Sequence, residues 1–238
     1  MIDYQRTKII ACATVIEEML PLLPDGMSYQ VLDFGLHLRP KNLKNVLQDA
    51  IDEAGQDADT IILGYGLCSM AVVGLVSSTC TLVVPRVDDC IAIFLGSSAA
   101  YREQIDKEPG TYYLTKGWIE VSDTLLDEYH RAAEKYGEEK AIRMMSVMLK
   151  NYTRLVYIDT GAKAQEHYQA YACQVADQFS LRYEIIPGAN DLIKKVLFGP
   201  WDTDFVVTPP GRAISYADFK IPLASSTQQK AAGSTTHG

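Results

Sequence analysis

The sequence has little of the material that several protein classes require. Only five of its 238 residues are cysteine, too few, and an odd number, for a small disulfide-stabilised fold. Lys and Arg total 22 against 30 Asp and Glu, which gives a formal net charge of -8 with no basic stripe. Nucleic-acid-binding domains normally gather cations on one face. We therefore expect neither nucleic acid nor an anionic membrane as a partner.

Long apolar runs are also missing. None approaches the ~18 residues of a membrane span, and the first residues lack the charged and apolar regions of a signal peptide. These features predict a cytoplasmic protein. In that reducing compartment, cysteines point to metal binding or catalysis before disulfide formation.

Short apolar runs alternate with helical patterns, which predicts an α/β fold with parallel sheets. The predicted strands are 8–11, 28–33, 60–63, 81–84, 154–159, 183–186 and 205–208. We predict two Rossmann-like halves with helices on both faces of each sheet. The expected boundaries are 1–121 for the first half, 122–152 for a helical connection, 153–223 for the second half and 224–238 for a flexible tail. Similarity between 29–47 and 183–197 suggests an internal duplication.

Three cysteines follow predicted strands of the first half. Cys12 comes directly after 8–11, while Cys68 and Cys90 stand near expected helix starts after 60–63 and 81–84. Ligands of parallel sheets bind beyond the carboxyl ends of the strands. Since neighbouring strands lie ~5 Å apart, three thiols at one edge would meet at a common point. The pattern therefore predicts a shared metal-thiolate site.

Other interpretations of these cysteines stay open. All three would also be explained as buried small hydrophobic residues, the structural role that we assign to Cys80 and Cys173. Cys90 alone could act as a thiolate nucleophile whose pKa is lowered by a helix N-terminus.

The spacing of the three cysteines matches no local zinc-finger or ferredoxin pattern, so two metal centres fit. Zinc held by three thiolates would be a Lewis acid with an open fourth position. A [4Fe-4S] cluster with one open iron would bind a substrate or transfer electrons.

Further candidates surround this edge. Asp89 would either orient the metal ligands or cap a helix, and Ser97 would either cap a helix or bind an anion at its N-terminus. His37, in a loop after the second strand, is a fourth candidate ligand, although a loop histidine is more often a hydrogen-bonding or solvated residue. Tyr65 lies in the turn before Cys68 and is expected to contact the substrate.

The segment 109–119 combines tyrosine, threonine, lysine and tryptophan between glycines, which is typical of a hairpin or a loop that lines a pocket. Tyr112, Thr115 and Lys116 are its candidate contacts to a substrate or cofactor, with Lys116 as a catalytic cation. Covering the edge of the core is the alternative role. A cleft between the halves would place either 159–161 or 201–202 opposite the cysteines.

Three blocks resemble a bacterial and archaeal family catalogued as a domain of unknown function: 65–68 (YGLC), 84–90 (VPRVDDC) with Gly96-Ser97, and 110–118 (GTYYLTKGW). The resemblance runs from Cys12 to about Trp201. Members tend to be encoded beside corrinoid-dependent methyltransferases in anaerobes, which implies one-carbon or corrinoid-linked chemistry. The three-thiol layout also resembles, at the level of the fold only, that of quinolinate synthase.

Together these inferences predict a metal-thiolate enzyme, or accessory enzyme, acting on a small substrate in one-carbon or methyl-corrinoid metabolism. Cys12, Cys68 and Cys90 would hold Zn²⁺ or a [4Fe-4S] cluster. Asp89, Lys116 and Tyr65 would be catalytic, and Ser97, Tyr112 and Thr115 would bind the cofactor or substrate. A corrinoid would enter through a partner protein or methyltransferase. The alternative is a non-catalytic protein that carries a cofactor or metal to such a partner.

Overall fold

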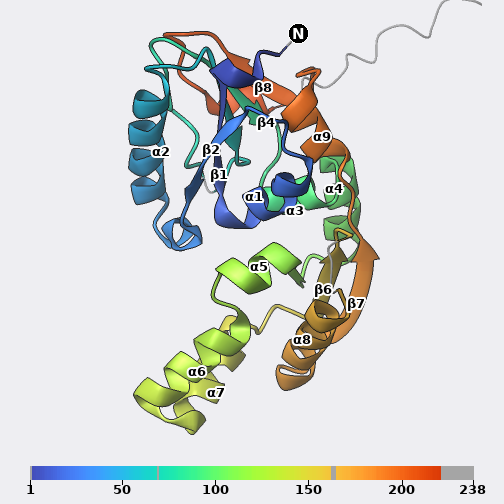
Figure 1. The fold of residues 1–238 in the computed structure, drawn as a ribbon. Helices are drawn as coiled ribbons and strands as arrows, with labels where there is room; N and C mark the ends of the chain where they lie inside the picture. Colours follow the sequence, from blue (N-terminus) through green and yellow to red (C-terminus); the bar gives the residue numbers. More distant parts are fainter. Residues whose placement is uncertain (1, 69, 162–164, 221–238) are drawn as a thin grey trace, which may run out of the picture.

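The computed structural model describes residues 2–68, 70–161 and 165–220, apart from the side chain of Leu38. Its fold is α/β, with two sheets in two lobes (Figure 1). The expected tail, 224–238, lies outside the described residues.

The first lobe is built on a five-stranded sheet. Its strands, in spatial order, are β2 (Ser28–Leu32), β1 (Thr7–Cys12), β3 (Thr60–Gly64), β4 (Thr81–Pro85) and β8 (Phe205–Thr208). The first four are parallel, and β8 is antiparallel to β4. The central strands are apolar throughout, because helices and loops cover both faces of the sheet.

The helices of the first lobe are α1 (Ala13–Met19), α2 (Pro40–Ala54), α3 (Cys90–Phe94), α4 (Ser98–Lys107) and α9 (Asp191–Phe198). Short 3₁₀ turns lie at Tyr4–Arg6, Leu20–Leu22, Phe34–Leu38 and Tyr216–Phe219. In α2, Leu43, Leu47 and Ile51 recur at helical spacing and are fully buried. This apolar stripe is the face that α2 presents to the core.

The second lobe holds a parallel sheet of β5 (Thr111–Leu114), β6 (Arg154–Asp159) and β7 (Arg182–Pro187). Its helices are α5 (Lys116–Val121), α6 (Leu125–Tyr136), α7 (Glu138–Met148) and α8 (Gln165–Gln178). In Figure 1 the carboxyl ends of β6 and β7 point toward the first lobe. The amide of Ala189 donates to the carbonyl of Phe94 at 2.9 Å where the chain returns to the first lobe.

All seven predicted strands are present, but the chain distributes them differently from the expected boundaries. The strand β5, from the expected first half, pairs with β6, whereas β8, from the expected second half, pairs with β4. The physical reason is that β4 would otherwise be an exposed edge of the large sheet, and β8 covers it. The suggested duplication stays a prediction.

The prediction of a helix that starts near Cys68 is wrong. The described residues there, 68 and 70–80, form turns and irregular backbone. Cys68 and Met70 have φ values of 44° and 72°. Residues in this left-handed region do not continue a right-handed helix. The segment is instead tied to the loop that follows β4.

Candidate functional site

The order of the strands brings Cys12, Cys68 and Cys90 to one edge. Cys12 ends β1, Cys68 follows β3 and Cys90 follows β4, and these three parallel strands are direct neighbours. The order 2-1-3-4 of the parallel strands has its switch point between β1 and β3, where successive connections leave in opposite directions. Cys12 and the loop that carries Cys68 therefore lie where ligands bind in sheets of this kind.

Backbone contacts hold the loop after β3 against the loop after β4. The amides of Leu67 and Cys68 donate to the carbonyls of Val87 and Asp88, at 2.9 and 3.1 Å. A Cβ atom on Gly66 would lie 2.7 Å from the Val87 carbonyl oxygen, so this close approach requires glycine. The two hydrogen bonds thus fix the position of Cys68 relative to the segment that leads into Cys90.

Tyr65 is buried in the same core as the three cysteines. Tyr65 is only 1% exposed. Its pKa is raised by burial first, and then by the side chains of Cys12, Cys68 and Cys90. The hydroxyl has no hydrogen-bond partner among the described residues. A buried polar group without a partner needs an explanation, such as a bound ion, water or ligand.

The three thiols are held in their neutral form. Burial raises the pKa of each, to about 12 for Cys68, and the neighbouring cysteines and Asp89 add to the shift at Cys68 and Cys90. The Cys12 Sγ atom lies 3.4 Å from the Thr14 hydroxyl oxygen. Ionising these thiols therefore requires a positive charge that the surrounding protein does not supply.

The raised pKa values of the cysteines affect two hypotheses, the lone Cys90 nucleophile and the shared metal site. A lone Cys90 nucleophile requires a lowered pKa, whereas the pKa of Cys90 is raised well above its ordinary value. A metal ion supplies the missing charge and deprotonates the thiols as it binds. In the described part of the chain, no three His, Cys, Asp or Glu side chains already stand in a metal-binding arrangement. Metal binding would thus require a different arrangement of these side chains from the one in this structure.

Asp89 and His37 border the cysteines. The Asp89 carboxylate accepts the Ile91 amide at 2.9 Å and the Tyr101 hydroxyl at 2.7 Å, so it caps α3. The His37 ring stacks on Tyr65, with ring centres 5.9 Å apart, and its Nδ1 atom lies 3.1 Å from the Phe34 carbonyl oxygen. That contact fixes Nδ1 as the protonated nitrogen and leaves Nε2 as the acceptor.

The remaining sequence candidates have structural roles of their own. Ser97 caps α4 by accepting the Ala100 amide at 3.1 Å, and the buried Thr115 caps α5 in the same way. Tyr112 packs in the core of the second lobe, against Tyr152, rather than in the core that contains the cysteines. The roles of Ser97, Tyr112 and Thr115 in binding a cofactor or substrate stay predictions.

Lys116 lies where the lobes meet. Its Nζ atom is 3.4 Å from Glu17 of α1 and 3.6 Å from Glu120 of α5. Burial lowers its pKa, but these two carboxylates outweigh that effect and raise it overall. Lys116 is therefore a paired cation and not a base.

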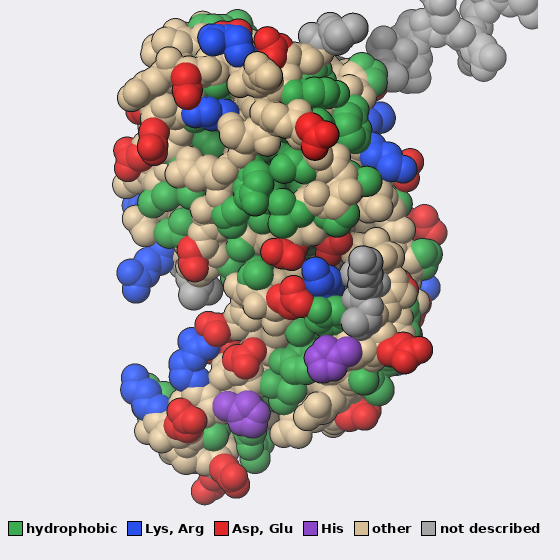
Figure 2. All heavy atoms as spheres, in the orientation of Figure 1, with side chains coloured by type: hydrophobic (Ala, Val, Ile, Leu, Met, Phe, Trp, Pro, Cys, Tyr) green, Lys and Arg blue, Asp and Glu red, His purple; other side chains and the backbone are tan. Residues whose placement is uncertain are grey.

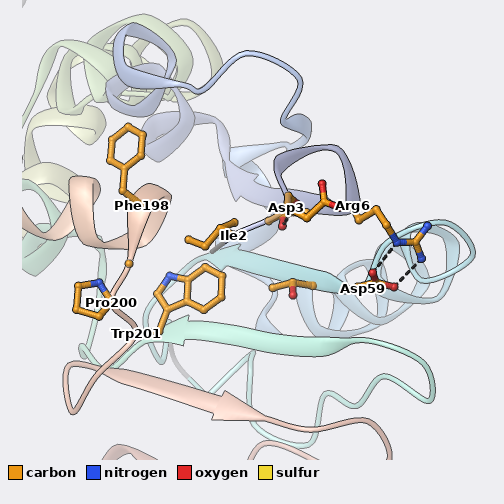
Figure 3. Close-up of a pocket in the computed structure, with 10 residues that line it drawn as sticks. Ile2, Asp3, Arg6, Asp59, Phe198, Pro200 and Trp201 are labelled. Atoms are coloured by element: carbon orange, nitrogen blue, oxygen red, sulfur yellow. Dashed lines mark hydrogen bonds and ion pairs between the residues drawn. The ribbon is translucent and has the colours of Figure 1, made fainter.

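Of the two segments expected to face the cysteines, only one lies near α1. Thr160 follows β6, and its hydroxyl is close enough to Glu18 of α1 to lower the pKa of that carboxyl group. Trp201 instead lines a cavity of about 590 Å³ with Ile2, Arg6 and Phe198, at the amino ends of β1 and β3 (Figure 3). Trp201 is thus at the opposite end of the sheet, because α9 returns the chain to that end.

Sequence reasoning missed Glu18 and Tyr157, which are buried beside Thr160. Tyr157 is fully buried and Glu18 is 9% exposed. The signal in the sequence is a second glutamate inside the apolar pattern of 15–20, where a helix would bury it.

None of the helices in the described ranges is long and apolar enough to cross a membrane.

Comparison with known proteins identifies a family without assigning an activity. No curated protein and no solved structure matches the chain. One family model, described as "Protein of unknown function (DUF1638)", matches residues 31–197. This range includes Tyr65, Cys68, Cys90 and Thr160, while Cys12 and Glu18 precede it. Since the match covers more than half of the 238 residues, the chain belongs to the DUF1638 family.

Proposed function

We propose that Cys12, Cys68 and Cys90 hold a zinc ion or a [4Fe-4S] cluster with one open coordination position. The observation that carries the proposal is the buried, unpartnered Tyr65 hydroxyl among three buried or partly buried cysteines at adjacent strand ends. Thiolates are preferred ligands of both centres. When bound, such a centre supplies Lewis-acid chemistry, or electron transfer in the case of the cluster.

The protein residues have distinct parts in this proposal. The three thiolates bind the centre, and the Tyr65 hydroxyl donates a hydrogen bond to a thiolate or to a group bound at the open position. His37 presents Nε2 from the ring stacked on Tyr65. Asp89, held by the Ile91 amide and the Tyr101 hydroxyl, orients the start of α3 and thereby Cys90.

An enzyme fits the site better than a carrier of metal or cofactor does. Cys12 and Cys68 are only 2% and 8% exposed. A carrier must release its metal to a partner, which favours accessible ligands, whereas a buried centre suits a metal that stays during turnover. We propose a small substrate in one-carbon or methyl-corrinoid metabolism, with a corrinoid protein or methyltransferase as partner. Turnover with a candidate methyl acceptor separates an enzyme from a carrier, which would bind without turnover.

The first test is the metal and acid-labile sulfide content of protein purified without oxygen. We expect stoichiometric zinc, or iron with sulfide, in the wild type and its loss in Cys68→Ala. Cys80→Ala is the matched control, because Cys80 is also fully buried but lies before β4, where its Sγ atom contacts the Ala58 carbonyl oxygen at 3.0 Å. Metal that persists in Cys68→Ala, or is absent from the wild type, would overturn the proposal.

A further inference from the structure

The helix α7 is apolar on two faces, and its own lobe covers only one of them. Ala141 and Met145, four residues apart, are buried in the second lobe. On the neighbouring face, Met144, Val147 and Met148 are 43%, 70% and 47% exposed. A helix that is apolar on more than one face is normally buried on each of them. The second apolar face of α7 therefore lacks a neighbour among the described residues.

This exposed face borders a groove of about 520 Å³ between α6 and α7. The apolar part of its lining is Ala132 of α6 with Met144, Met145, Val147 and Met148 of α7. Methionine side chains are flexible and polarisable, and methionine-rich grooves commonly bind another amphipathic helix. In Figure 1 the pair α6 and α7 lies at the end of the second lobe that points away from the first lobe. The groove is thus open to a partner.

Charges of both signs stand at the rim of this groove. Glu128 lines it from α6, and Lys140 and Arg143 line it from α7. Within the chain, Glu128 contacts Arg131 at 3.8 Å and Arg143 contacts Glu139 at 3.6 Å. Long, exposed pairs of this kind contribute little and leave both charges available to a partner. Figure 2 shows acidic and basic side chains interspersed over this pair of helices, at the lower left of the view.

The direction of the two helices determines which charges would meet across a symmetric contact. The groove is lined both by Glu128, in the first turn of α6, and by Met148, the last residue of α7, so the helices run in opposite directions. A two-fold axis that crosses α7 sets two copies of this helix antiparallel. Lys140 and Arg143, in the amino-terminal half of one α7, then lie beside the carboxyl-terminal half of the other. That half is the one that Glu128 borders.

We propose that the groove between α6 and α7 binds a second copy of the same chain, so that four helices pack as a two-fold symmetric bundle. The exposed apolar face of each α7 fills the groove of the other copy, and burial of this face drives the association. Glu128 of each copy pairs with Lys140 or Arg143 of the other. A self-complementary contact requires charges of both signs on one surface, as this groove has. An anionic membrane or a nucleic acid would instead favour a rim of cations alone.

The test is sedimentation velocity of the full chain over a wide range of protein concentration. We expect a species with twice the 26.4 kDa mass of one chain. Val147→Glu should give a monomer, because it places a carboxylate at the centre of the contact, while its circular dichroism spectrum should stay that of the wild type because the position is exposed. Ile142→Glu is the matched control, since Ile142 is 54% exposed on the same helix but lies outside the groove, beside Tyr129 and Phe179. This control should remain a dimer.

A charge exchange tests the antiparallel arrangement. Glu128→Arg and Arg143→Glu should each weaken dimerisation by about tenfold or more, because each brings like charges together across the axis. The double variant should recover most of the wild-type affinity. A monomeric wild type overturns the proposal, even if the groove binds some other protein. A dimer that withstands Val147→Glu, that is lost equally in Ile142→Glu, or that the double charge exchange does not restore, overturns it as well.

Discussion

The buried polar groups at the two ends of β6 differ in whether they have hydrogen-bond partners. At its amino end, the fully buried Arg154 donates to Thr111 at 2.9 Å, Glu184 at 3.1 Å and Gln104 at 3.3 Å. At its carboxyl end, Tyr157 has no partner among the described residues. Arg154 at the amino end is thus held by several partners, while the carboxyl end keeps a buried hydroxyl without one.

The large sheet shows the same difference. At its amino end, Arg6 donates two hydrogen bonds to Asp59, and Lys8 pairs with Asp57 at 2.6 Å. At its carboxyl end lie the neutral thiols and the unpartnered Tyr65 hydroxyl. Parallel sheets bind ligands at their carboxyl ends, and the unpartnered Tyr65 hydroxyl lies at that end of the large sheet.

The largest effect on stability is expected at the amino end of β6, where Arg154 has its partners. Arg154→Ala should lower the free energy of unfolding by about 3–5 kcal/mol, because it leaves Glu184 and Glu108 beside an empty, buried position. Urea denaturation measures this loss. Arg131→Ala, which breaks only exposed ion pairs with Asp123 and Glu128, should change stability little. Equal effects of the two substitutions would contradict the distinction between the ends of β6.

Gly117→Ala should destabilise the protein by about 1–3 kcal/mol, because the new methyl group meets the backbone of α1. Helix propensity alone predicts the opposite, a gain of up to about 1 kcal/mol. Thermal unfolding decides the sign. A stabilised variant would show that the contact between α1 and α5 yields easily.

Glu18→Gln should stabilise the free protein by about 1–2 kcal/mol at neutral pH, since an amide loses less on burial than a carboxylate does. Burial raises the pKa of Glu18 above its ordinary value of 4.5. The folded protein therefore favours the protonated form, and wild-type stability falls as the pH rises above 4.5 toward the raised pKa. The advantage of the variant should grow over that interval and vanish below it, as urea titrations at several pH values would measure. A difference that does not depend on pH would refute this assignment.

The smallest effect is expected for Tyr65→Phe. In chelator-treated protein its stability should equal or exceed that of the wild type by up to about 1 kcal/mol, because the hydroxyl has no partner to lose. In protein loaded with metal, the same change should be destabilising if the hydroxyl donates to the centre. Thermal unfolding with and without chelator gives both values, and a loss in the chelated protein would mean that the hydroxyl is already satisfied.

Local patterns predicted the elements and one cluster of residues. Short apolar runs followed by helical spacing located β1, β3 and β4, and with them the cysteines at the strand ends. The same patterns failed at Cys68, where hydrogen bonds to the next loop hold a left-handed residue. The local pattern after Cys68 predicted a helix. It could not predict the hydrogen bonds to a loop twenty residues further along the chain, which hold this segment in another conformation.

The environment of Glu18 illustrates why other features could not be predicted. Glu18 looks like an ordinary helical glutamate until α5 and the residues after β6 close over it. Glu18 and Thr160 come from segments about 140 residues apart, and no local pattern relates such segments. Burial without a partner arises only from the assembled fold.

The sequence by itself therefore determined the α/β class, the strands and the presence of a thiol at three strand ends, because these depend on short-range periodicity and backbone preference. Tertiary structure decided that β1, β3 and β4 are neighbours, that β8 joins the first sheet, and that Glu18 is buried beside Thr160. Those outcomes depend on how apolar faces pack and cover strand edges, which is a property of the whole chain.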